Sequence, residues 1–591
     1  MKAVTDPAAL LLRRLLRLLR WRLWIQEKLQ FTEWQVTLLW AALAGLIGAL
    51  AAMLFSVLAE GIHELLTGYS SGVVETMRQL PWWARILVPA LGGLLAGLTL
   101  LFGKHLTRNQ SSTDYMEAIV IGSGDLPLRS TVVKSAAALF SIGSGGSIGR
   151  EGPMVHLAAT MASLVGRWRQ FSPPQLRLLV ACGAAAGIAS AYNAPIAGSF
   201  FVAEIILGTI AMESLGPLAV SAVVAALTVR VLTDAHQLYR VPAFRLNSPW
   251  EMGPYILLGL VAGTVAPWFL RSLRAAERWF VGTTMPLIAR LVLGGIIVGD
   301  IAVFVPEVCG NGYSVVVSIL NGHIAWAALI VVFVAKWVAT ASSFGSGAPG
   351  GVFTPTLFMG ASVGYLFGTA VHTVWPAGAA APEAFALVGM GAFLSAATYA
   401  PVMAVIMLFE MTLSYDIILP LMLCSVLAYY TAKGLEGQSL YSESLRRKAA
   451  EVPADILPAG RVRDLMKLKP PVMPATARFA DIARMFLTVR VNNVYVVDAE
   501  GRFLGAVSLH DIKPYLGNPD LTELVIASDI MRDDFPRIGP EQSLSDGLGA
   551  FLGVSDERLP VVEPEGGQLV GSLAKGDLLL ALVEKRKKPA V

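Results

Sequence analysis

Charged residues are scarce in this sequence, and their scarcity excludes most soluble proteins. Only 15% of the 591 residues are charged, and the formal net charge is only +4. A nucleic-acid-binding chain normally carries a marked basic excess, so we expect no nucleic-acid partner. Hydrophobic residues make up 55% of the chain, and the mean hydropathy is +0.61. This composition indicates a membrane protein.

Cysteine is also rare, and the three cysteines lie far apart in apolar segments, at Cys182, Cys309 and Cys424. Their spacing is neither a disulfide framework nor a zinc site, so we interpret them as small buried residues. We find no nucleophile–base set and no metal-ligand spacing, and therefore predict neither an enzyme nor a metal site. We also expect no cleavable signal peptide. Residues 10–24 instead read as a basic amphipathic helix, which we expect to lie on anionic lipid at the cytoplasmic membrane surface.

Two regimes of composition divide the chain. Apolar segments of full or near-full spanning length recur up to about residue 433, and the shorter ones indicate broken, tilted or re-entrant helices. From about residue 443 the chain turns polar and alternating. We predict an amphipathic N-terminal segment at 1–32, a transmembrane domain at 33–442, a linker at 443–461, and two soluble α/β modules at 462–518 and 526–586.

The most distinctive feature of the transmembrane domain is a duplicated glycine-rich stretch. Residues 143–153 read GSGGSIGREGP, and residues 345–355 read GSGAPGGVFTP. Further along, an Ala-Pro pair followed by a glutamate also occurs twice, ending at Glu204 and at Glu410. Repeats of this kind in transporters are commonly inverted, with broken helices meeting at a site near the midplane. We therefore predict that the two stretches face each other as halves of one ion site.

A glycine-rich break at the start of a helix suits an anion. Glycine lets the backbone approach a ligand closely, and the first amides of a helix lack partners within it. These amides and the helix dipole attract an anion through partial charges, weakly enough to release it. Glu151 is unusual because its carboxylate would take the place of that anion, and would gate the site by swinging out or by binding a proton. The alternative is a helix-capping carboxylate paired with Arg150.

Together these motifs resemble the CLC family of chloride channels and proton/chloride exchangers. The resemblance rests on GREGP at 149–153 and GVFTP at 351–355, with GNGY at 310–313 and NAP at 193–195. TDYMEA at 113–118 is similar to the bacterial ClcB type. The resemblance implies an all-α polytopic membrane protein with an inverted repeat and about 17 or 18 helices. It also implies a homodimer in the bacterial inner membrane, with one pore in each subunit.

The same resemblance assigns roles to individual residues. Glu151 matches the gating glutamate of the family, and chloride is the implied substrate, with no cofactor. The backbone amides of Val352 and Phe353 and the hydroxyl of Tyr441 match the groups that coordinate the central anion. The amides from Arg150 to Gly152 match the outer site.

The sequence departs from the family pattern at two places. The usual Gly-Ser-Gly-x-Pro serine is replaced by NQSSTD at 109–114, where Gln110, Ser111 or Ser112 is the candidate donor, so the preferred anion is open. The inner proton-relay glutamate is replaced by Ile205. We therefore favour passive conduction of chloride gated by Glu151, with proton-coupled exchange as the alternative. Glu204 is a candidate for a proton pathway, or it fixes a helix end together with Glu410.

Other side chains in the membrane domain allow two interpretations. His156 reads as a hydrogen-bonded core residue rather than as a relay. Lys134 and Lys336 occupy matching places in the repeat, where they raise the potential for anions or simply snorkel at helix ends.

The C-terminal modules both read as helix, strand, glycine turn, strand and helix, and resemble a cytoplasmic tandem pair of CBS domains. Asp511 and Asp577 occupy the position at which many such domains hold an adenosine ribose. They are candidate ligands of an adenine nucleotide, or caps of the helices that they open.

Two functions of other classes fit the sequence less well. A CBS-regulated cation carrier would need acidic residues that converge within the membrane, whereas the repeats converge on glycine amides. A membrane-bound sensor without transport gives no reason for the duplicated broken helices.

Overall fold

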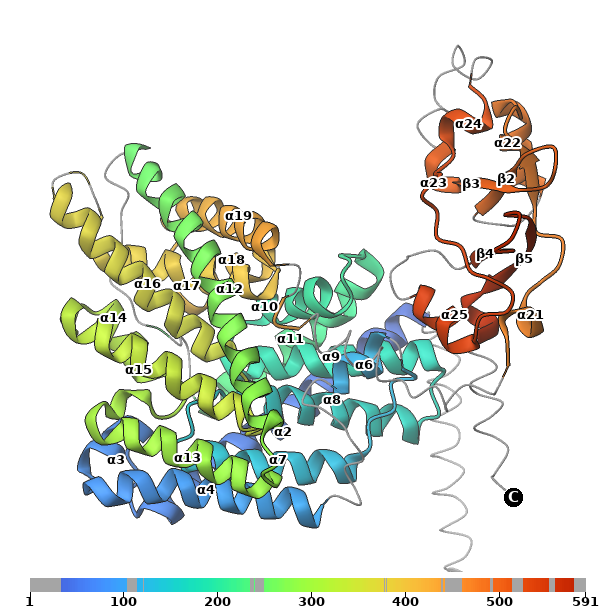
Figure 1. The fold of residues 1–591 in the computed structure, drawn as a ribbon. Coiled ribbons are helices and arrows are strands. Elements are labelled where there is room, and N and C mark those ends of the chain that lie inside the picture. Colours follow the sequence, from blue (N-terminus) through green and yellow to red (C-terminus); the bar gives the residue numbers. More distant parts are fainter. Residues whose placement is uncertain are drawn as a thin grey trace, which may run out of the picture. The chain divides into compact units, whose positions relative to one another are not determined.

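The structure, a computed structural model, divides into two compact units, residues 1–444 and residues 445–591. The first unit is helical, and the second combines short strands and helices (Figure 1). The N-terminal segment predicted at 1–32 and most of the linker predicted at 443–461 lie outside the described residues. Described are residues 33–103, 114–120, 122–233, 239, 249–376, 378, 380–436, 439–441, 460–488, 493–512, 525–551 and 558–578.

In the described part of the first unit, nine helices are long and apolar enough to cross a membrane. They are α2 (Glu33–Thr67), α4 (Trp82–Phe102), α9 (Pro173–Tyr192), α11 (Met212–Thr233), α12 (Met252–Gly282), α13 (Leu287–Phe304), α15 (Trp326–Gly345), α16 (Phe353–Val374) and α19 (Ile418–Leu435). Their lengths range from 18 residues in α13 to 35 in α2. A helix as long as α2 exceeds the roughly 30 Å hydrocarbon core unless it tilts.

The remaining helical segments of this unit are shorter or less apolar. They are α3 (Val73–Gln79), α6 (Asp114–Val120), α7 (Leu128–Gly143), α8 (Glu151–Trp168), α10 (Pro195–Phe200), the π-helical η1 (Phe201–Ile206), the 3₁₀ turns η2 (Pro249–Glu251) and η3 (Pro306–Val308), α14 (Tyr313–Leu320), α17 (Pro382–Thr398) and α18 (Pro401–Thr412). Partial helices of this kind agree with the predicted broken architecture.

The internal repeat appears as two matching runs of helices, α7 to α10 and α15 to α18. In each run the first helix ends at the glycine-rich stretch and the second begins inside it. The third helix ends at a residue in the left-handed region, Asn193 with φ 52° or Tyr399 with φ 61°. A proline then opens the next helix, where its missing N–H costs no hydrogen bond. The same backbone break is thus built twice.

Small residues let the helices of each run pack closely. α16 and α17 lie side by side (Figure 1). A Cβ placed at Gly360 would lie 2.5 Å from the carbonyl oxygen of Gly389. Close approach of backbones through small residues is typical of membrane helices. It holds α16 directly against α17.

The second unit contains two related halves. In the first, β1 (Val472–Pro474) pairs parallel with β2 (Asn493–Val497), which pairs antiparallel with β3 (Phe503–Ser508). In the second, β4 (Arg558–Val562) pairs antiparallel with β5 (Leu569–Ala574). The helices of both halves are α21 (Val462–Leu465), α22 (Phe479–Thr488), α23 (Leu509–Ile512), α24 (Ala527–Ile530) and α25 (Leu544–Phe551).

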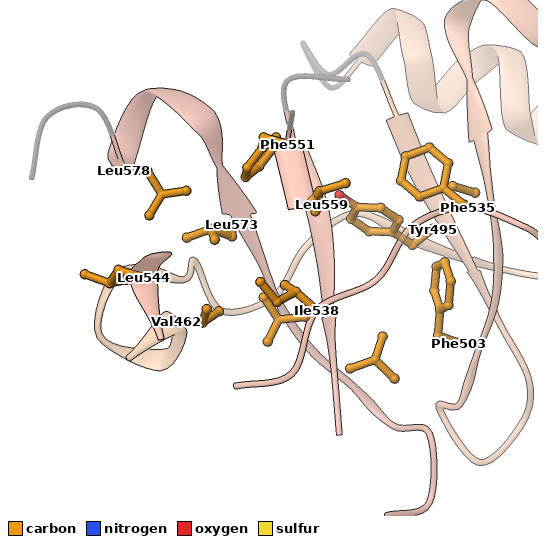
Figure 2. Close-up of a cluster of buried hydrophobic side chains, with 13 residues drawn as sticks. Val462, Tyr495, Phe503, Phe535, Ile538, Leu544, Phe551, Leu559, Leu573 and Leu578 are labelled. Atoms are coloured by element: carbon orange, nitrogen blue, oxygen red, sulfur yellow. The ribbon is translucent and has the colours of Figure 1, made fainter. Parts of the chain in front are cut away.

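The two halves of this unit both contribute to its two buried hydrophobic clusters, and each half packs its leading segment on the other. Figure 2 shows Tyr495 of the first half beside Leu559 of the second in one buried cluster. The amide of Val462 donates to the carbonyl of Gln542, and the amide of Ala527 donates to the carbonyl of Ala477. Each half therefore begins by docking on the other.

An ion-pair cluster anchors the end of the membrane unit, just before Tyr441. Glu436 follows α19, and its side chain is 14% exposed. Its Oε2 lies 2.6 Å from Arg271 Nε and 3.2 Å from Arg274 Nη2. Burial raises the pKa of Glu436, but the hydrogen bonds and charges of Arg271 and Arg274 outweigh it and leave the pKa below its ordinary value.

We expect Glu436→Gln to lower the melting temperature in detergent at pH 7 by a few degrees. Because the folded state holds the Glu436 proton less tightly than the unfolded chain, the stabilisation is present above the ordinary pKa of glutamate. It is lost as the pH falls through the lowered pKa of the folded state. Thermal melts should show a constant difference between about pH 7 and pH 5 and a narrowing difference below about pH 4.5. Glu213→Gln, at an exposed site, serves as the control, and a difference that stays constant with pH would contradict the assignment.

Candidate functional site

The two glycine-rich stretches meet directly. The amide of Gly149 donates to the carbonyl of Gly351 at 2.6 Å, and the amide of Gly351 donates to the carbonyl of Gly149 at 2.8 Å. The hydroxyls of Ser147 and Thr340 lie 3.0 Å apart beside this bridge. These reciprocal contacts confirm the prediction that the two stretches face each other.

The carboxylate of Glu151 lies at the N-terminus of α16. Thr354 donates to it twice, from its amide to Oε1 at 2.9 Å and from its hydroxyl to Oε2 at 3.1 Å. Glu151 is only 4% exposed. The first amides of a helix and its dipole favour a negative charge at this place. The carboxylate therefore occupies a position suited to an anion.

Glu151 therefore caps a helix, but the helix belongs to the other repeat. The sequence-based alternative was a cap paired with Arg150. The guanidinium of Arg150 instead lies 3.8 Å from a carboxylate oxygen of Glu60, while Thr354 supplies two hydrogen bonds to Glu151. The Glu151 carboxylate is therefore inserted between the two repeats and does not form an ion pair with Arg150 within its own loop.

Aromatic side chains surround the start of α16. The ring of Tyr192 lies 5.3 Å from that of Phe353, and its hydroxyl lies 3.0 Å from the hydroxyl of Thr354. Phe201 lies between Phe353 and Tyr441, with ring centroids 6.2 and 5.8 Å away. The structure thus gathers Tyr441 and Phe353 around one aromatic cluster beside Glu151.

Tyr192, Phe201 and Thr354 lie at the site but were not predicted from the sequence. Thr354 lies in the GVFTP motif, Tyr192 directly precedes Asn193 of the NAP motif, and Phe201 lies between that motif and Glu204. Their closeness in sequence to these motifs is the feature from which they could have been predicted. Of the predicted residues, Val352 and Phe353 are buried at the start of α16. Arg150 and Gly152 flank Glu151, whereas Ser111 and Ser112 lie outside the described residues.

Glu204 and Glu410 cap helices reciprocally across the repeats. The carboxylate of Glu204 accepts from the amides of Val402 and Met403, at 3.2 and 2.7 Å. The carboxylate of Glu410 accepts in the same way, from the amides of Ile196 and Ala197 at 3.0 and 2.7 Å. Each glutamate thus binds the N-terminus of the helix that follows Ala-Pro in the other repeat. This arrangement favours the helix-end interpretation over a proton role.

The buried basic side chains have structural partners. His156 Nε2 lies 3.1 Å from the Thr131 hydroxyl, as expected of a core histidine. Lys336 is fully buried and donates to the carbonyls of Val308 and Gly310 at 2.8 and 2.6 Å. Lys134 is only partly buried. Snorkelling therefore does not describe Lys336, which fixes a turn instead.

In the second unit, Ser508 caps α23 and Asp511 completes the capping box. Asp511 Oδ2 accepts from the amide and the hydroxyl of Ser508, at 2.9 and 2.7 Å, at the start of α23. Asp577 lies 3.8 Å from the ammonium group of Lys467. Within the described ranges, no group of His, Cys, Asp or Glu could hold a metal ion.

Comparisons with known proteins agree with this geometry. The sequence profile of the voltage-gated chloride channel family matches residues 102–433, and that of the CBS domain matches 462–518 and 527–584. A ClcB-like protein of Ralstonia nicotianae is 50% identical over 413 residues, which are 69% of this chain and 96% of that protein. The voltage-gated ClC-type chloride channel ClcB of Escherichia coli is 39% identical over 411 residues, covering 69% and 98%.

Solved structures share the fold. A slow cyanobacterial Cl⁻/H⁺ antiporter superposes with a TM-score of 0.63 at 25% identity, covering 70% of this chain and 98% of its own. A eukaryotic CLC transporter superposes with a TM-score of 0.59 at 19% identity, covering 92% and 97%, which bears on the fold alone. The chain is therefore a multi-pass membrane protein of the voltage-gated chloride channel (CLC) family, with a C-terminal pair of CBS domains.

Proposed function

We propose that this chain conducts chloride passively across the bacterial inner membrane and that Glu151 is its gate. The observation that carries the proposal is the seat of the Glu151 carboxylate on the amide and the hydroxyl of Thr354. A site that holds one negative group at a helix N-terminus can hold another in its place. The pathway is closed while the carboxylate fills the site and opens when the side chain leaves.

The chemistry of the site suits an anion that must also depart. The groups around Glu151 are backbone amides, hydroxyls and aromatic rings, and the proposed anion ligands are the amides at Arg150, Gly152, Val352 and Phe353 and the hydroxyl of Tyr441. The fully buried Lys336 donates to two backbone carbonyls instead. Neutral donors bind chloride without the strong hold of a full positive charge. Binding of this moderate strength supports transport of chloride, because the ion can both enter the site and leave it.

Passive conduction is favoured over proton-coupled exchange by the residues near the inner end of the pathway. Ile205 cannot carry a proton, and both carboxylate oxygens of the adjacent Glu204 accept from backbone amides. The Escherichia coli relative is named a channel and the cyanobacterial neighbour an antiporter. Exchange of chloride for protons is therefore the second candidate.

One liposome experiment separates the two mechanisms. Vesicles containing the purified protein are given an outward chloride gradient, and anion efflux and external pH are recorded together. We expect chloride to leave the vesicles without driving protons against their own concentration gradient. Proton uptake or release driven uphill by chloride would replace conduction with exchange, and the absence of any anion flux would overturn transport itself. Protein-free vesicles set the baseline.

The remaining features of the proposal follow from family membership. We propose a homodimer with one pore in each subunit, a transmembrane domain at 33–442, and a linker at 443–461 that leads to cytoplasmic CBS domains at 462–518 and 526–586. Binding of an adenine nucleotide at Asp511 and Asp577 stays a prediction.

A further inference from the structure

The carboxylate of Glu151 is held by a chain of hydroxyls that crosses the two repeats. Tyr192 is the last residue of α9 in the first repeat, and Thr354 lies in the first turn of α16 in the second. The Tyr192 hydroxyl lies 3.0 Å from Thr354 Oγ1, which lies 3.1 Å from Glu151 Oε2. All three side chains are buried.

The chemistry of the three groups fixes the direction of this chain. An ionised carboxylate only accepts hydrogen bonds, so the Thr354 hydroxyl must donate its proton to Glu151. The same hydroxyl can then only accept from Tyr192, which must be the donor. Each bond polarises the next in a buried chain. Tyr192 therefore strengthens the hold of Thr354 on the carboxylate without contacting the carboxylate itself.

Tyr192 is held in place for this task by its surroundings. Its ring packs against that of Phe353 at 5.3 Å, and the next residue, Asn193, ends α9 in the left-handed region. The second repeat has Thr398 at the matching place, and that hydroxyl donates to Leu394 of its own helix. The contact with the other repeat thus occurs on one side only, the side that faces Glu151.

We propose that Tyr192 and Thr354 form a hydroxyl latch that keeps the Glu151 carboxylate in the anion site and thereby sets how often the pathway is open. Tyr192 is a positioning residue that acts through Thr354. The latch rests on the proposed function of Glu151 as the gate. Releasing it favours the open pathway, because fewer hydrogen bonds oppose the departure of the carboxylate.

The test measures chloride flux from liposomes for Tyr192→Phe and Thr354→Val, each alone and combined with Glu151→Ala. Tyr192→Phe removes one neutral hydrogen bond and should raise the chloride flux by about 2- to 10-fold. Thr354→Val removes a hydrogen bond to the charged carboxylate and should raise the chloride flux by about 10-fold or more. Thr354→Ser restores the hydroxyl and should bring the flux back toward the wild-type value. Thr369→Val, which removes a hydroxyl that donates within α16 to Tyr365, is the matched control.

The combined variants decide between a latch and other roles. In the Glu151→Ala background there is no carboxylate to hold, so the Tyr192→Phe increase should vanish. An increase that persists there, or a flux unchanged by Tyr192→Phe alone, would overturn the latch. Failure of the proposed function gives a different result. In that case the wild-type protein shows no chloride flux, or Glu151→Ala leaves the chloride flux unchanged. Tyr192→Phe keeps the ring that packs on Phe353, and size-exclusion profiles verify folding of every variant.

Discussion

Glu151→Ala should raise chloride flux at neutral pH by at least about tenfold and abolish its dependence on pH. The wild-type carboxylate accepts two hydrogen bonds from Thr354. Hydrogen bonds to a charged group contribute about 1.5–3 kcal/mol each, and about 1.4 kcal/mol corresponds to a tenfold change in an equilibrium. Alanine has no group to fill the site and none to bind a proton, so the pathway stays open at every pH.

Chloride efflux from liposomes between about pH 4.5 and pH 7.5 measures this effect, a range chosen to span carboxylate titration. Glu151→Gln keeps the shape of the side chain but cannot ionise, so it should lose the pH dependence while retaining part of the block. Glu213→Ala, at an exposed carboxylate in α11, should behave as the wild type does. Flux in Glu151→Ala that follows pH as in the wild type would place the gate at another residue.

Gly364→Ala should cause the largest loss of stability among single-methyl additions to α16. A Cβ at Gly364 would lie 2.1 Å from the carbonyl oxygen of Phe385 and 2.8 Å from the Cα of Ala386. Both are backbone atoms of α17, so the two helices must separate. Overpacking costs about 1–3 kcal/mol when side chains can adjust, and a backbone contact leaves less freedom to do so. We expect a melting temperature in detergent lower by at least several degrees.

Gly216→Ala provides the matched control. Gly216 lies in α11, and nothing lies within 4 Å of a Cβ placed there. Alanine has the higher helix propensity, by about 1 kcal/mol in a helix interior, so this variant should melt at or above the wild-type temperature. Equal melting temperatures for the two variants would show that α16 and α17 are not held by close backbone contact.

Much of the site could be predicted from the sequence because the repeat carries its own geometry. Two copies of one glycine-rich motif predicted two facing helix starts, and Gly149 and Gly351 meet as expected. The partners of Glu151 could not be predicted, because the choice between Arg150 and the opposite helix depends on the packing of the repeats. The same holds for Glu204, whose role depends on which helix end it reaches.

Tyr192 was not predicted either, because its role also depends on how the repeats pack. An aromatic residue at the end of an apolar helix is ordinary in a membrane protein, and its hydroxyl gains importance only from Thr354 on a distant segment. Tyr441 was placed by family resemblance alone, and the structure links it to Phe353 through Phe201.

The reciprocal caps of Glu204 and Glu410 also bear on how the protein is made. Helix α10 belongs to the first repeat, yet its opening amides donate to the carboxylate of Glu410, which leaves the ribosome only near the end of the membrane domain. The first repeat therefore reaches its final hydrogen bonding at α10 only after α18 of the second repeat has been synthesised.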